Sequence, residues 1–120
     1  RSLAILGKID ESEVFCLKCL EENGLNPIFY FLLGGVYLQK DLAQKAIEPL
    51  KRALFLNPNF IMAHFLLAKV MHNEGNVQAA GLHKRVTLEL LSQMEATVIV
   101  PGSEQMTVGL LKEKTEAIGL

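Results

Sequence analysis

Residues 27–60 read PIFYFLLGGVYLQKDLAQKAIEPLKRALFLNPNF, and this stretch decides the fold. Leu33 and Tyr37 lie one helical turn apart, so both side chains face the same partner helix. Gly34 is small, which allows a second helix to approach closely. Pro58 cannot continue a helix, so the second helix must end there. The stretch therefore predicts two closely packed helices.

The spacing of these residues resembles the tetratricopeptide repeat (TPR), in which W-x2-L-G-x2-Y, A-x3-F and a later proline recur with a fixed period. The chain has Tyr in place of Trp and Leu in place of Phe, at Tyr30, Leu33, Gly34, Tyr37, Ala46, Leu50, Ala53 and Pro58. A step of one period forward gives a second repeat with Leu67, Ala68, Met71, a turn at 74–76 and Ala80. In that repeat Lys84 replaces Leu50 and Thr87 replaces Ala53. This is typical of a terminal repeat, which meets water or a different neighbour.

A step of one period backward indicates a truncated repeat in residues 1–26. Cys16 and Cys19 then fall at the packing positions of Leu50 and Ala53. Gly7 aligns with Gly75, which predicts a turn between two helices there, and the second helix is expected to open at residues 10–12. Residues 1–95 are thus predicted to be an all-α TPR helical-hairpin solenoid of about two and a half repeats, 1–26, 27–60 and 61–95.

The segment after the repeats is expected to hold an extended linker and one further helix. Residues 96–102 contain a β-branched run closed by Pro101-Gly102, and we interpret them as a linker without a sheet to join. Ser103 is a good N-cap, with Glu104 in the first turn, so residues 103–120 are assigned to an amphipathic C-terminal helix. Its apolar stripe comprises Met106, Leu110, Leu111, Ala117 and Ile118. We expect this helix to fold back on the repeats; the alternative is docking on a neighbouring domain.

The bulk composition excludes several classes of protein. The chain has 120 residues, 50% of them hydrophobic, and a formal net charge of −1 without a basic cluster, so no nucleic-acid partner is expected. No apolar run approaches the roughly 20 residues of a membrane-spanning helix, so no membrane association is expected. The two cysteines lie in one short stretch, which favours a reducing compartment and predicts a cytoplasmic location. The helix already under way at the first residues predicts that the chain is cut from a longer protein.

The candidate catalytic and metal-binding residues do not form a recognisable site. Cys16 and Cys19 form a C-x-x-C pair, but a structural zinc needs four ligands and no second pair exists, so packing is the favoured role. His64 takes the position of Tyr30 and is expected to be a packed ring, whereas His72 and His83 are expected on different helices and faces. No nucleophile is placed with a base and an acid. The sequence therefore predicts no catalytic residue, no metal and no cofactor.

A partner-binding groove is predicted on the first helix of each repeat, which lines the inner surface of a TPR solenoid. Its residues are Ile28, Phe31, Leu38, Gln39, Met62, Phe65, Lys69, His72 and Asn73. Most of the first four are apolar, and basic or amide residues that could grip a carboxylate are nearly absent. Two interpretations stay open: the groove binds an amphipathic helix of a partner, or the chain's own final helix covers it.

A longer resemblance involves residues 30–111. The stretch ALFLNPNF at 53–60, followed by AHFLLA at 63–68, Gly75, Leu90-Leu91 and SEQMT at 103–107, resembles the TPR region after the catalytic domain of CheR-type chemotaxis methyltransferases. The resemblance implies a parent enzyme that methylates receptor glutamates with S-adenosylmethionine, with its catalytic domain before residue 1. The module would dock a chemoreceptor, a signalling protein or the methyltransferase domain itself. The alternative is a general TPR scaffold in another assembly.

Overall fold

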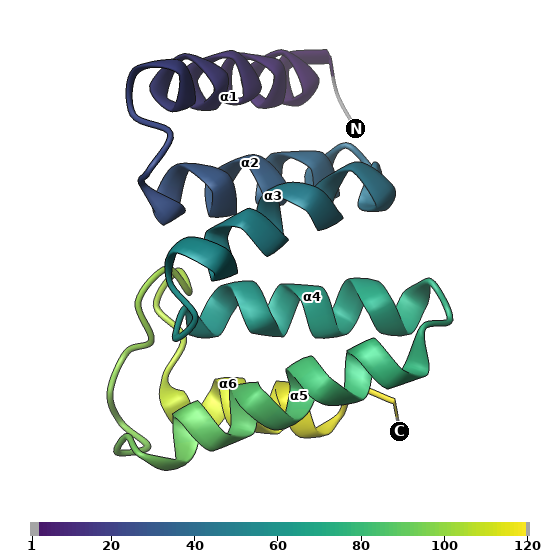
Figure 1. Ribbon diagram of the computed structural model, residues 1–120, viewed down its shortest axis with the longest axis vertical. Helices are drawn as coiled ribbons and strands as arrows, with labels where there is room; N and C mark the ends of the chain where they lie inside the picture. The colour runs from purple at the N-terminus through teal and green to yellow at the C-terminus, as the bar shows by residue number, and fades with distance from the viewer. Residues whose placement is uncertain (1–2, 120) are drawn as a thin grey trace. The chain divides into compact units, whose positions relative to one another are not determined.

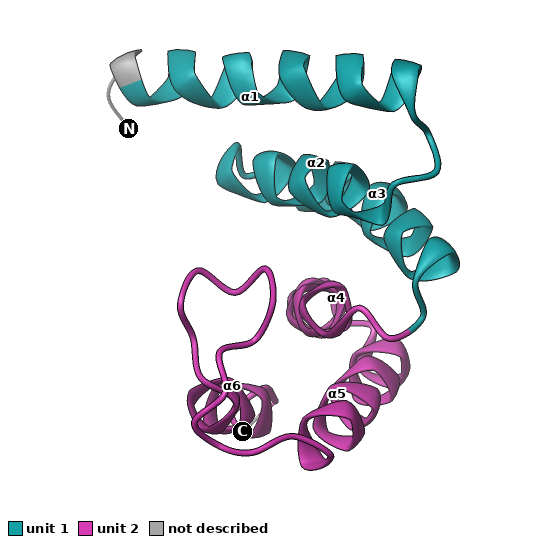
Figure 2. Cartoon of the chain, turned by 90° about the vertical axis from the view of Figure 1, so that its left-hand side faces the viewer, with its two compact units in different colours: residues 1–58 teal, residues 59–120 magenta. Residues whose placement is uncertain are grey.

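The computed structural model describes residues 3–119, with side chains from residue 5 onward, and these residues form six helices, α1 to α6 (Figure 1). The chain divides into two compact units, residues 1–58 and residues 59–120 (Figure 2). Within the described part of the chain, no helix is long and apolar enough to cross a membrane.

The first unit contains α1 (Leu3–Glu22), α2 (Pro27–Gln39) and α3 (Ala43–Leu56). Helix α2 begins where the sequence offers both a cap and a rigid first residue. The side chain of Asn26 accepts a hydrogen bond from the backbone N–H of Ile28 at 3.0 Å, and Pro27 has the φ that the first helical position needs.

Helices α2 and α3 pack as the small residues predict. A Cβ atom added to Gly34 would lie 2.7 Å from Cγ of Leu50 and 2.8 Å from its Cδ2. Leu50, Ala46 and Ala53 are all 0% exposed. Since real Cβ atoms do not approach so closely, Leu50 occupies the space that a side chain at position 34 would need.

The turns that join the two helices of each repeat have the same backbone geometry. In the first, the N–H of Leu42 donates to the carbonyl of Tyr37, and in the second the N–H of Asn76 donates to that of Met71. Both bonds are 2.8 Å long, and their partners are one repeat apart in the sequence. The left-handed residue is Asp41 (φ 59°) in one turn and Gly75 (φ 84°) in the other. Aspartate tolerates this conformation better than most residues, so the turn forms without glycine.

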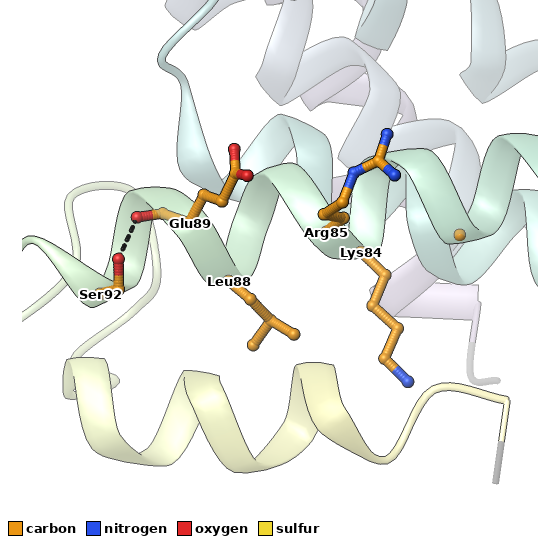
Figure 3. Close-up of a pocket in the computed structure, with 6 residues that line it drawn as sticks. Lys84, Arg85, Leu88, Glu89 and Ser92 are labelled. Atoms are coloured by element: carbon orange, nitrogen blue, oxygen red, sulfur yellow. Dashed lines mark hydrogen bonds between the residues drawn. The ribbon is translucent and has the colours of Figure 1, made fainter.

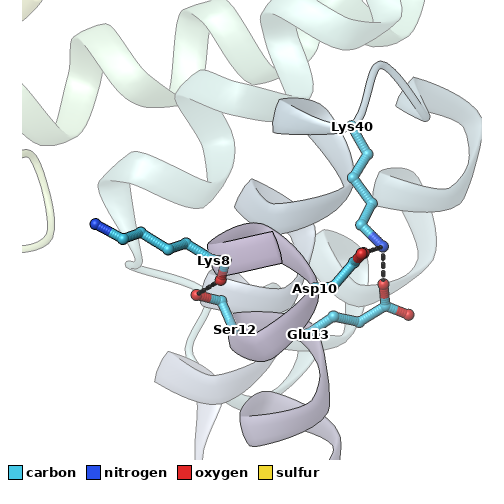
Figure 4. A network of polar contacts seen from close by, with 5 residues as sticks. All are labelled: Lys8, Asp10, Ser12, Glu13 and Lys40. Atoms are coloured by element: carbon cyan, nitrogen blue, oxygen red, sulfur yellow. Dashed lines mark hydrogen bonds and ion pairs between the residues drawn. The ribbon is translucent and has the colours of Figure 1, made fainter. Parts of the chain in front are cut away.

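The prediction of a turn at Gly7 is wrong. Helix α1 runs unbroken through Gly7 and residues 10–12. The hydroxyl of Ser12 donates to the carbonyl of Lys8 at 3.0 Å, one turn back within the helix (Figure 4). A single glycine inside a helix costs only about 1 kcal/mol, and no residue after it supplies a left-handed turn. The first unit therefore has one long helix where a partial hairpin was expected.

The second unit contains α4 (Ile61–Asn73), α5 (Val77–Ser92) and α6 (Val108–Glu116). Helix α5 begins directly after the predicted turn at 74–76, and its N-cap is Asn76, whose side chain accepts from the N–H of Ala79 at 3.1 Å. Helices α4 and α5 pack against each other, and α6 folds back onto α5. The apolar core includes Ala63, Leu67, Ala68, Leu91 and Leu111.

The segment between α5 and α6 differs from the expected linker and helix start. Ile99 and Thr107 form an antiparallel bridge, flanked by bonds from the N–H of Val100 to Met106 O (2.9 Å) and from that of Val108 to Val98 O (2.8 Å). The chain therefore reverses in a small β-like loop.

Ser103 is not the N-cap of the last helix. Its hydroxyl donates to the carbonyl of Val100 at 2.5 Å and accepts from the N–H of Met106 at 3.1 Å, inside the loop. Glu104 and Gln105 have φ values of 54° and 76°, which cannot begin a right-handed helix. Thr107 caps α6 instead, by accepting from the N–H of Leu110.

The buried face of α6 also differs from the predicted stripe. Val108, Leu111 and Thr115 are buried, whereas Leu110 is 43% exposed and Ala117 is exposed. Met106, Ala117 and Ile118 lie outside α6, which begins later and ends earlier than expected, and only Leu111 belongs to both sets.

Candidate partner-binding surface

Helix α2 presents an exposed apolar face, which we call the α2 stripe. Its members recur at helical spacing and are Ile28, Phe31, Leu32, Gly35, Leu38 and Gln39. Ile28 is 53% and Leu32 42% exposed, while Phe31 and Leu38 are half-buried. A Cβ atom at Gly35 would meet nothing within 4 Å, so the middle of the stripe is open. Helix α2 contains no charged residue, so nothing on the helix itself favours a charged ligand.

Sequence reasoning identified four of these six residues and missed Leu32 and Gly35. Leu32 was missed because the repeat pattern assigns residues to the inner surface by their position in the repeat and takes no account of how exposed each side chain is. The spacing of residues 28, 32, 35 and 39, one turn or two apart on a helix, was a signal that could have found them.

The predicted groove residues of α4 lie in two different environments. Met62 and Phe65 are only 5% and 4% exposed. Their side chains belong to the core and not to a surface that a partner could contact. Lys69, His72 and Asn73 are exposed. The ammonium group of Lys69 lies 5.4 Å from the centre of the Phe65 ring, a cation–π distance.

The loop between α5 and α6 belongs to the same unit as α4 and rises to the level of that helix (Figures 1 and 2). Val100 and Ser103 of this loop are 1% and 4% exposed. Only part of the α4 face is therefore open, whereas the α2 stripe keeps large exposed apolar side chains.

Lys84 joins α5 to the end of α6. Its ammonium group donates to the carbonyl of Glu116 at 3.0 Å and to that of Ile118 at 2.7 Å. The last carbonyls of a helix lack partners within the helix and carry partial negative charge, so a lysine there is favourable. The replacement of Leu50 by Lys84 in the repeat pattern is thereby explained: this position contacts α6.

A shallow cleft of about 390 Å³ runs along the same face of α5 (Figure 3). It is lined by Gly81, Lys84, Arg85, Leu88, Glu89 and Ser92. Lys84 and Leu88 point toward α6, whereas the charged ends of Arg85 and Glu89 lie on the other side of α5 in this view. Most of the surface that lines the cleft is therefore apolar.

A network of ion pairs ties α1 to the end of α2. Lys40 lies 2.5 Å from a carboxylate oxygen of Asp10 and 2.6 Å from one of Glu13 (Figure 4). The hydrogen bond to Asp10, and then that to Glu13, raises the pKa of Lys40. Because these contacts join two helices of the first unit, we assign them a structural role.

The two cysteines lie on α1, where Cys16 is buried and Cys19 half-buried, and both are free thiols. Burial, and secondarily the neighbouring Cys19, raises the pKa of Cys16, which lowers its reactivity because the thiolate is the nucleophile. This environment agrees with the packing role. Among the described residues, no three His, Cys, Asp or Glu side chains come together as a metal site.

The histidines form one contact that the sequence analysis did not predict. His64 is 8% exposed, as a packed ring should be, but its Nδ1 lies 3.1 Å from Nδ1 of His83. His72 is exposed on α4. The repeat pattern could not predict the contact between His64 and His83, because His83 falls at a position for which the pattern requires no particular residue.

No protein-family model matches the chain. Three curated proteins align with it. Superkiller complex protein 3 of Homo sapiens is 32% identical over 93 aligned residues, and the alignment covers 72% of the chain and 6% of that protein. Anaphase-promoting complex subunit CDC16 of Saccharomyces cerevisiae is 37% identical over 67 aligned residues, and the alignment covers 53% of the chain and 8% of that protein.

The third relative is the Tetratricopeptide repeat and J domain-containing co-chaperone DNJ1 of Cryptococcus neoformans, 28% identical over 86 residues, 72% of the chain and 16% of that protein. The tetratricopeptide repeat in its name is the repeat that the periodic spacing and the two helical hairpins of this chain indicate. The fold is that of a TPR segment. The matched part of the chain spans between 6% and 16% of the length of these three relatives.

The relatives bear on function at a coarse level. The three relatives support a protein–protein interaction module. Two are named as components of a complex and one as a co-chaperone, and none is named as a methyltransferase. The predicted kinship with the CheR region is therefore not supported by these relatives.

Proposed function

We propose that this chain is an adaptor segment of a larger multiprotein assembly, in which the α2 stripe binds an amphipathic helix of a partner protein. The general scaffold hypothesis is favoured over the chemotaxis methyltransferase hypothesis, since the relatives are named as complex components and a co-chaperone. The identity of the partner, and the presence of an enzyme domain in the parent protein, are proposals as well.

The observation that carries the proposal is the chemistry of the α2 stripe. Two large aliphatic side chains are about half exposed, and burying each contributes on the order of 1.5–3 kcal/mol to binding before its costs are subtracted. Gly35 leaves room for a partner side chain to approach the backbone. Because helix α2 has no charge, a helix that inserts apolar residues at i, i+3 and i+4 fits better than a carboxylate or a phosphate.

The test uses a photo-crosslinking amino acid at position 32 of the full-length parent protein in its own cells. The crosslinked partner is identified, purified and titrated against the chain. We expect Ile28→Glu to weaken its binding at least tenfold, because a charge is forced into an apolar contact. Phe55→Glu is the matched control, since Phe55 is 86% exposed on α3 and lies outside the stripe. Equal loss in both variants, or in neither, would refute the stripe as the binding surface.

The methyltransferase hypothesis has a separate test. The full-length parent is incubated with labelled S-adenosylmethionine and purified chemoreceptors. Methyl transfer to receptor glutamates that changes when residues 1–120 are deleted would restore that hypothesis over the general scaffold. We expect no transfer.

A further inference from the structure

The contact between His64 and His83 joins two helices of the second unit through a pair of ring nitrogens. His64 lies in the first turn of α4, and His83 lies in the middle of α5. Their ring centres are 5.4 Å apart, the planes are tilted by 41°, and the two Nδ1 atoms are 3.1 Å apart. Sites built on helices hold their geometry well, so this pair is positioned by the packing of α4 on α5.

Two ring nitrogens 3.1 Å apart repel each other unless a proton or a metal ion lies between them. A neutral imidazole has one N–H and one lone pair, so the contact is favourable when one Nδ1 carries a proton and the other accepts it. If both rings carry their proton on Nε2, two lone pairs face the same space. A metal ion then takes the place of the shared proton. The displaced proton leaves Nδ1 for Nε2 of the same ring or for solvent.

The separation also fits a metal. Imidazole nitrogens bind Zn²⁺ at about 2.0–2.1 Å, so two ligands of one ion lie about 3.3 Å apart in tetrahedral geometry and about 2.9 Å apart at adjacent octahedral positions. The observed 3.1 Å lies between these values. The rings must tilt to aim their lone pairs at one point, but the helices need not separate.

We propose that His64 and His83 form a two-histidine site for a borderline divalent metal ion, of which Zn²⁺ and Ni²⁺ are representatives. Imidazole suits these ions, whereas Mg²⁺ prefers oxygen ligands. Among the described residues no third His, Cys, Asp or Glu joins the pair. A metal bound there links α4 to α5 and stabilises the second unit by mass action.

The test adds Zn²⁺, Ni²⁺ or Mg²⁺ chloride to the 120-residue chain with Cys16→Ala and Cys19→Ala, which removes the two competing thiols. Thermal unfolding is followed by circular dichroism, and long-range ¹H–¹⁵N NMR spectra observe the imidazole nitrogens. We expect Zn²⁺ to shift the Nδ1 signals of His64 and His83, and Zn²⁺ and Ni²⁺ to raise the unfolding midpoint by several degrees. Mg²⁺ should do neither.

The controls use the third histidine and a conservative replacement. His72→Gln, on the same helix as His64 but exposed, should keep the full response. His83→Gln, which leaves an amide beside His64, should lose it while the helical spectrum stays unchanged. If His83→Gln unfolds, the proposal is judged from the NMR shifts of the chain that carries only the two cysteine substitutions. The proposal is overturned if the Nδ1 signals of His64 and His83 do not move up to about 1 mM metal, or if His83→Gln responds like His72→Gln.

Discussion

The hairpins α2–α3 and α4–α5 share one backbone plan and differ in the chemistry of their second helix. Both have the same turn, closed by a hydrogen bond at the same position of each repeat. The small residue of the first helix is Gly34 in one hairpin and Ala68 in the other. On the second helix, Leu50 is fully buried against Gly34, whereas the equivalent Lys84 extends to the end of α6.

This difference shows that a repeat becomes terminal through a few substitutions. Thr87, which replaces Ala53, is 0% exposed, and its hydroxyl donates to the carbonyl of His83 at 2.7 Å. Thr115 of α6 is equally buried and bonds Leu111 O in the same manner. Since each hydroxyl is satisfied within its own helix, neither leaves an unpaired polar group in the core.

The largest effect is expected from truncation at the packing position. Leu50→Ala should destabilise the first unit by about 2–5 kcal/mol, because it removes a fully buried side chain and leaves a cavity. Urea unfolding, with hydrogen exchange to resolve the two hairpins, measures the change. Lys84→Ala at the matched position should cost clearly less. Equal losses would mean that the two positions are equivalent after all.

The second largest effect is expected at Gly34 and Gly35, two adjacent glycines of α2 that differ in the space around them. Gly34→Val should destabilise by about 1–3 kcal/mol through overpacking against Leu50. Gly35→Ala, one residue along and facing open space, should instead stabilise the helix by about 0.5–1 kcal/mol. Thermal unfolding of the two variants decides. If Gly34→Val is tolerated as well as Gly35→Ala, the close approach of α2 and α3 is not required.

A third, smaller effect concerns the link from α5 to α6. Lys84→Met keeps most of the aliphatic stem and removes the two donated hydrogen bonds, at an expected cost of about 1–2 kcal/mol. Amide hydrogen exchange should accelerate in α6 and stay unchanged in α2 and α3. Arg85→Met, an adjacent cation with an exposed side chain, serves as the control. A uniform acceleration across both units would contradict the local role of Lys84.

The smallest expected effect is a difference between the two units in how their stability depends on pH. Burial raises the pKa of Cys16 and of Tyr37, and the hydrogen bonds to Asp10 and Glu13 raise that of Lys40. A raised pKa in the folded state gives stability that is present below the unfolded pKa and lost as pH rises through the folded pKa. All three groups lie in the first unit, and the lowest ordinary value is 9.0, that of Cys16.

The first unit should therefore lose stability progressively above about pH 9, while the second changes less. Urea unfolding at a series of pH values, followed by an NMR amide signal in each unit, measures this. Lys40→Met together with Cys16→Ala should flatten the profile of the first unit. An equal alkaline loss in both units would assign the effect to other groups.

The sequence predicted the helical hairpins well because their packing depends on local spacing. Gly34, Leu50 and Pro58 each impose a steric requirement that can be read without a structure. Gly7 misled the interpretation, since a glycine predicts a turn only where neighbouring residues also leave the helix. Ser103 misled it in the same manner: a serine caps a helix or closes a loop, and the choice depends on the φ values of Glu104 and Gln105.

The candidate surface was less predictable because exposure is a tertiary property. The repeat pattern placed Phe65 and Phe31 at equivalent positions, yet Phe65 is buried and Phe31 half-buried. The contact of His64 with His83 depends on side chains from two helices that meet only after folding. Such a contact leaves no periodic signal in the sequence when one of its residues, here His83, lies at a position that the repeat pattern does not define.

The ammonium group of Lys84 also limits how this array could be lengthened by gene duplication. A copy of residues 61–92 inserted after Ser92 would place a new first helix where α6 now lies. Lys84 would then face apolar side chains without its two carbonyl partners, at the cost of burying an unpaired charge. A duplicated repeat would therefore require an apolar residue in place of Lys84, because the lysine is suited to the end of a helix such as α6.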